Sequence, residues 1–105
     1  MVIMSYDHAW ELLYLAVRTL ATETGTIRPR LEHAFLNMAH LQEKELPADL
    51  VPKFRAIESA LTTATLTSGE GSIAATVRQL RDDEAKEIAE QIVHMFIELQ
   101  GHEKH

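Results

Sequence analysis

Cysteine is absent from the 105-residue chain, so neither a disulfide bond nor a thiolate metal site can form. This composition suits a reducing compartment, and we expect the cytoplasm. Long apolar runs are also missing, since no stretch approaches the ~20 residues that a membrane helix needs. The N-terminal segment lacks a basic region and carries Asp7 and Glu11, which argues against a signal peptide. We therefore expect no association with a membrane.

Positive charge is in short supply. Ten Lys and Arg face sixteen Asp and Glu, which gives a formal net charge of −6. That balance opposes the phosphate backbone, so nucleic acid is not the expected partner. Two small basic pairs, Arg28 with Arg30 and Lys53 with Arg55, keep a nucleic-acid-associated regulator open as an alternative.

Strand-like alternation of useful length is missing as well, whereas apolar residues recur at helical spacing along the chain. We therefore predict an all-α fold, a compact irregular bundle of four main helices plus one short helix. The chain is expected to form a single helical domain over residues 1–105, with 101–105 as a disordered tail.

The pattern predicts long helices over about 5–22, 27–41, 49–61 and 82–100, and a short helix over about 72–80. Polar residues at the start of these segments are expected to cap them, namely Ser5, Thr26, Ser72 and Asp82 or Asp83. Pro29 and Pro52 are expected in the first turns of their helices. Gly101 is expected to end the last helix. The stretch 62–72, which includes the sequence GEGS, has the composition of a loop.

The first helix has a wider apolar arc than one neighbouring helix can cover. We expect the flank with Trp10 and Val17 to pack within the chain, and the flank with Leu12 and Leu15 to meet a second copy. The sequence thus predicts a homodimer. On the second helix, Leu36 lies opposite the buried stripe, between His33 and His40, and these residues extend the predicted interaction surface.

Arg28 and His33 form a second pattern. Their spacing is similar to the arginine–histidine spacing of the small helical ribonucleases called HEPN domains. The resemblance implies that Arg28 would stabilise phosphate charge and that His33 would act on a ribose hydroxyl or leaving oxygen. On a regular helix the two residues lie ~140° apart. Within one chain they would converge only if Arg28 lay outside the helix, and a dimer could bring them together across its interface. Catalysis by this pair is therefore an alternative and not our main prediction.

Glu90, His94 and Glu98 repeat at four-residue spacing on the outer face of the last helix. Carboxylate and imidazole groups can bind zinc or iron, which makes these three residues candidate metal ligands. A metal centre normally gathers ligands from several elements, and inward Glu-x-x-His motifs on two helices are missing. We therefore expect a solvated helix face, with neither metal nor cofactor.

These observations favour a small acidic protein–protein interaction module that is not an enzyme. Antitoxin-, immunity- and adaptor-like proteins include chains of this class. A HEPN-like ribonuclease using Arg28 and His33 is the first alternative, and a nucleic-acid-associated regulator is the second. The sequence names neither the partner nor the pathway.

Overall fold

The computed structural model describes residues 6–62 and 72–103. Over these residues the chain is all-α and compact, as predicted, with four main helices and one short one. They are α1 (Asp7–Thr22), α2 (Ile27–Met38), α3 (Val51–Leu61), the short α4 (Ser72–Gln79) and α5 (Asp82–Glu103). Two 3-10 helices that the sequence did not predict, η1 (Glu43–Glu45) and η2 (Ala48–Leu50), connect α2 to α3.

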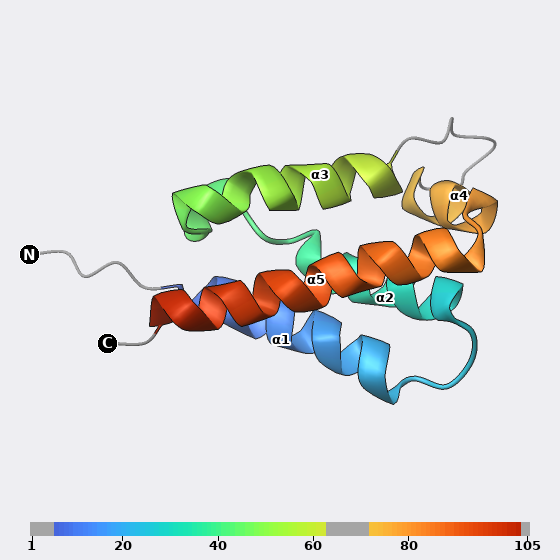
Figure 1. Cartoon of the computed structure of the whole chain (residues 1–105), viewed down its shortest axis with the longest axis horizontal. Coiled ribbons are helices and arrows are strands. Elements are labelled where there is room, and N and C mark those ends of the chain that lie inside the picture. The colour runs from blue at the N-terminus through green and yellow to red at the C-terminus, as the bar shows by residue number, and fades with distance from the viewer. Residues whose placement is uncertain (1–5, 63–71, 104–105) are drawn as a thin grey trace, which may run out of the picture.

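The 22-residue α5 is the central element of the bundle. It lies in front of α1 and α2 in Figure 1, with α3 along its upper edge and α4 beside its first turns. Each helix turns an apolar stripe toward the others, as amphipathic helices do. The largest fully buried side chains come from α1, α2, α3, α5 and the end of η2: Leu13, Leu31, Phe35, Met38, Leu50, Ile57, Leu61, Ile92, Met95 and Leu99.

The turn between α1 and α2 depends on one glycine. Gly25 has a φ of +106°, a conformation that residues with a Cβ rarely adopt. Thr26 occupies the N-cap position of α2, but its side chain makes no capping hydrogen bond, which corrects the prediction. Pro29 lies in the first turn of α2, as expected.

The starts of the later helices agree with the prediction only in part. Pro52 lies in the first turn of α3, as expected. Ser72 is the first residue of α4, and α5 begins at Asp82. Just before α5, the backbone N–H of Arg81 donates to a carboxylate oxygen of Glu84 over 2.9 Å. This bond is one half of a capping box.

Gly101 does not end the last helix, because α5 continues to Glu103. His102, within this extension, pairs with the carboxylate of Asp49 at 3.1 Å and contacts the ring of Tyr6 edge-on. Both contacts offset the modest cost of a helical glycine. Ser5, the stretch 63–71 with most of GEGS, and the last two residues of the predicted tail lie outside the described residues.

No helix among the described residues is long and apolar enough to cross a membrane.

Candidate functional site

Arg28 and His33 point to different parts of the fold. The Arg28 guanidinium lies 3.3 Å from the Leu80 carbonyl and 3.4 Å from the Arg78 carbonyl, at the end of α4. It also lies 3.4 Å from a carboxylate oxygen of Asp82. His33, in contrast, bonds to Glu23 in the α1–α2 turn at 2.8 Å. The two side chains are therefore engaged separately within one chain.

Arg30, two residues further along α2, has a similar role at another helix end. Its Nη1 donates to the Leu20 carbonyl over 2.8 Å and its Nε donates to the Thr26 carbonyl over 3.3 Å. The last carbonyls of a helix lack partners within the helix, and a cationic donor there also favours the helix dipole. Arg28 and Arg30 thus bind carbonyl groups at the C-terminal ends of α4 and α1, respectively.

The candidate metal ligands on α5 do not assemble a site. The carboxylate of Glu98 is ion-paired with Lys53 of α3, so it already has a cationic partner. Glu90 and His94 are exposed on the surface. No group of three or more metal-ligating side chains comes together in the part of the chain that the structure describes.

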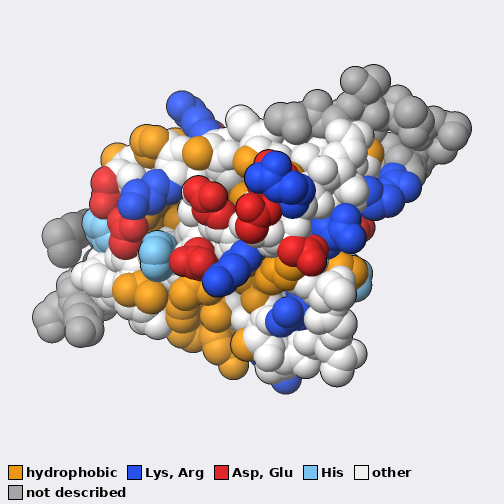
Figure 2. Space-filling view, turned by 45° about the vertical axis from the view of Figure 1, so that its right-hand side comes forward, with side chains coloured by type: hydrophobic (Ala, Val, Ile, Leu, Met, Phe, Trp, Pro, Cys, Tyr) orange, Lys and Arg blue, Asp and Glu red, His pale blue; other side chains and the backbone are white. Residues whose placement is uncertain are grey.

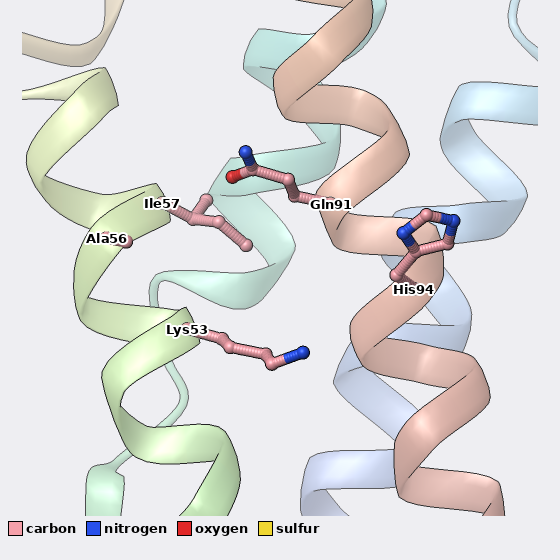
Figure 3. A pocket seen from close by; sticks show the side chains of 5 residues that line it. All are labelled: Lys53, Ala56, Ile57, Gln91 and His94. Carbon is pink, nitrogen blue, oxygen red and sulfur yellow. The ribbon is translucent and has the colours of Figure 1, made fainter.

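Lys53 and His94 line an open hollow of about 300 Å³ between α3 and α5, together with Ala56, Ile57 and Gln91. Figure 3 shows Lys53 and Ile57 reaching from α3 toward α5, and Gln91 reaching back. The ammonium group of Lys53 already binds Glu98, so it is not free to bind an anionic ligand in this hollow. Nothing in this lining pairs a nucleophile with a base.

Charged pairs hold the α2–α3 connection to the rest of the bundle. Arg55 of α3 binds Glu43 with two hydrogen bonds of 2.7 Å, and this bidentate contact holds the pKa of Glu43 below its usual 4.5. The pKa of Glu45 is also lowered, by the backbone N–H of Gln42 and then by His8 of α1. These contacts hold the α2–α3 connection in place, and each described carboxylate in them is paired with a partner that stabilises the fold.

The predicted interaction surface on α1 and α2 is only partly exposed. Leu12 and Leu15 are half-buried, and Leu12 packs against the core. Leu36 is 46% exposed, and His33 and His40 near it are exposed as well. Leu36 is thus the one large exposed apolar side chain of this predicted set.

A second apolar surface lies where α1 meets α5, and it combines the partly buried Trp10, Val93 and Phe96 with two exposed side chains. Trp10 and Tyr14 of α1 stack with ring centroids 5.2 Å apart, and Phe96 of α5 lies 5.5 Å from Trp10 and 6.4 Å from Tyr14. Ile97 follows Phe96 and lies one turn from Val93 on α5. Tyr14 is 43% exposed and Ile97 is 58% exposed. We call these five residues the α1–α5 surface.

Figure 2 shows hydrophobic side chains gathered below a band of charged ones on the face that it views. From the sequence we placed Trp10 on the apolar arc of α1, but we identified neither Tyr14 nor Ile97 as part of an exposed apolar surface. The available signal was an isoleucine between His94 and Glu98 on the outer face of a regular amphipathic helix. Large aromatic side chains that pack on one another and stay partly exposed are typical of protein contact surfaces.

Comparison with known proteins adds no relative: no family model, curated protein or solved structure matches the chain.

Proposed function

We propose that the chain is a non-enzymatic protein–protein interaction module, and that the α1–α5 surface makes the contact. One observation carries the proposal: Tyr14, which stacks on Trp10, and Ile97, which follows Phe96 on α5, are both large and about half exposed, and Trp10 packs against Phe96 between the two helices. Side chains of this size cost ~1.5–3 kcal/mol each when they are fully exposed rather than buried. A partner that covers them recovers part of that free energy.

The aromatic composition supports a contact with protein. Tryptophan, tyrosine and phenylalanine are enriched at protein interfaces, where they bury a large area with few rotatable bonds. A single exposed leucine such as Leu36 needs no such explanation. Among the described residues, the α1–α5 surface combines several large apolar side chains that touch one another.

The charge of the chain supports the same class of partner. A net charge of −6 repels nucleic acid and leaves proteins as the favoured partners. The absence of cysteine suits the cytoplasm, where we propose that the module works. Antitoxin-, immunity- and adaptor-like proteins remain the class with which we compare it.

The ribonuclease alternative receives no support from the contacts of its two residues. It would need the Arg28 guanidinium and the His33 imidazole to be directed at one phosphate. Arg28 is directed at the end of α4 and His33 at Glu23.

Site-specific photo-crosslinking in the native host tests the proposal without assuming which protein binds. A photoreactive phenylalanine analogue replaces Ile97 in one variant and Glu87 in a control. Glu87 is also an exposed residue of α5, but it is outside the α1–α5 surface. We expect a covalent adduct of discrete mass from the Ile97 position and none from the Glu87 position. Adducts that are absent, or the same from both positions, would contradict the proposal.

A further inference from the structure

Two charged residues flank Tyr14 on α1. Glu11 and Arg18 are both exposed, and their side chains make no hydrogen bond or ion pair with any described residue. They are two helical turns apart, with Tyr14 between them near the same stripe of the helix. The exposed edge of the α1–α5 surface therefore has a negative charge at one end and a positive charge at the other, and neither is paired with a described residue.

We infer that a second copy of the chain covers the α1–α5 surface, with the two α1 helices antiparallel across a two-fold axis. In this arrangement Glu11 of each copy faces Arg18 of the other. The inference rests on the proposed function and adds the identity of the partner and the arrangement of the contact.

The symmetry follows from the positions of the two charges. A two-fold axis that crosses α1 midway between residues 14 and 15 exchanges positions equally far from it, which brings Glu11 opposite the partner's Arg18. Because a two-fold contact is self-complementary, each such pair forms twice. A parallel arrangement would instead bring Glu11 against Glu11 and Arg18 against Arg18, which is unfavourable for like charges.

The rest of the surface is compatible with this arrangement. Tyr14 lies next to the axis, so the most exposed ring of the surface is covered at the centre of the contact. On α5, Lys86 and Glu90 are one turn apart and of opposite sign, so this part of the rim carries no net charge. Asp7 lies as far from the axis as Thr22, whose hydroxyl group is an uncharged neighbour for a carboxylate.

Charge-exchange variants test the inference by light scattering and sedimentation over a concentration series. We expect the unmodified chain to be a dimer. Glu11→Arg and Arg18→Glu should each weaken dimerisation about tenfold, because each replaces two attractive pairs by two repulsive ones. The double variant, which exchanges the two charges, should dimerise nearly as well as the unmodified chain. Circular dichroism verifies that every variant remains helical.

Glu87→Arg is the matched control. It makes the same change of charge as Glu11→Arg on an exposed part of α5 outside the contact, and it should leave dimerisation unchanged. A double variant as weak as the single ones would overturn the antiparallel arrangement. An unmodified chain that stays monomeric at high micromolar concentration would overturn the inference as a whole. The proposed function would survive that result if the crosslinked adduct at Ile97 contained a different protein.

Discussion

Trp10 and Tyr14 stack face to face, with ring centroids 5.2 Å apart and ring planes 3° from parallel. The two residues are one turn apart on α1, so the helix itself sets their alignment. Phe96 of α5 packs against both rings and fixes them to the neighbouring helix. The contact keeps Tyr14 ordered at the surface, and order in an exposed aromatic side chain lowers the entropic cost of binding a partner.

The stack makes Trp10, the only tryptophan of the chain, a reporter of this surface. Tyr14→Ala should leave the fold intact at a cost of about 1 kcal/mol and should raise the quenching of Trp10 fluorescence by acrylamide. Leu36→Ala removes a similarly exposed side chain from α2 and should leave the quenching unchanged. Equal quenching in the Tyr14→Ala variant and the unmodified chain would mean that the ring does not shield Trp10.

Arg28→Ala should lower the free energy of unfolding by about 1 kcal/mol, because it removes a charged donor from the carbonyls at the end of α4. The guanidinium is partly exposed, which limits the loss. Chemical denaturation measures this effect. The same preparations should not cleave RNA with or without the substitution. If RNA cleavage were present and were lost in both Arg28→Ala and His33→Ala, with both variants folded, the pair would be catalytic after all.

Substituting alanine for each of two glycines should have opposite effects. Gly25→Ala should cost about 1–2 kcal/mol, since its φ of +106° strains any residue with a Cβ. Gly101→Ala, within α5 and with no neighbouring atom in the way, should stabilise the chain by up to about 1 kcal/mol. Thermal unfolding compares the two variants. A stabilised Gly25→Ala variant would rule out the strained turn.

Stability should fall as the solution becomes acidic. The bidentate bond from Arg55 lowers the pKa of Glu43 in the folded chain, and the side-chain bond from Arg81 lowers that of Asp83. A lowered folded pKa gives stability that is complete above the unfolded values of 4.5 and 3.8 and is lost below them. The Tm should therefore drop from about pH 5 downward. Glu43→Gln should lower the Tm near neutral pH and approach the unmodified chain in acid, whereas a constant Tm difference would contradict this assignment.

Much of the fold could be predicted from the sequence, because the apolar periodicity is strong. The end of α5 could not, since the contacts of His102 with Asp49 and Tyr6 that favour its last turn come from distant segments. The roles of Arg28 and Arg30 could not be predicted either, because they depend on carbonyl groups at the ends of α4 and α1, which come from other segments. Periodicity alone does not reveal which helix ends meet in space.

The candidate site was only partly predictable. The wide apolar arc of α1 predicts more apolar surface than one neighbouring helix covers, and α1 packs against both α2 and α5. Which flank stays exposed depends on where α5 lies. Trp10 on one side and Leu12 on the other are both partly buried against the core, but Trp10 faces Phe96 and its neighbour Tyr14 stays 43% exposed. We therefore propose the α1–α5 surface as the contact of the predicted homodimer, in place of the flank with Leu12 and Leu15.

The mass of the Ile97→Glu variant in solution tests the central claim most directly. The α1–α5 surface should place this 58% exposed side chain in the contact between two copies, where a buried carboxylate is strongly unfavourable. Light scattering at high micromolar concentration should find a dimer for the unmodified chain and for Leu36→Glu, and a folded monomer for Ile97→Glu. A dimer that persists in Ile97→Glu and dissociates in Leu36→Glu would contradict the account and move the contact to α2.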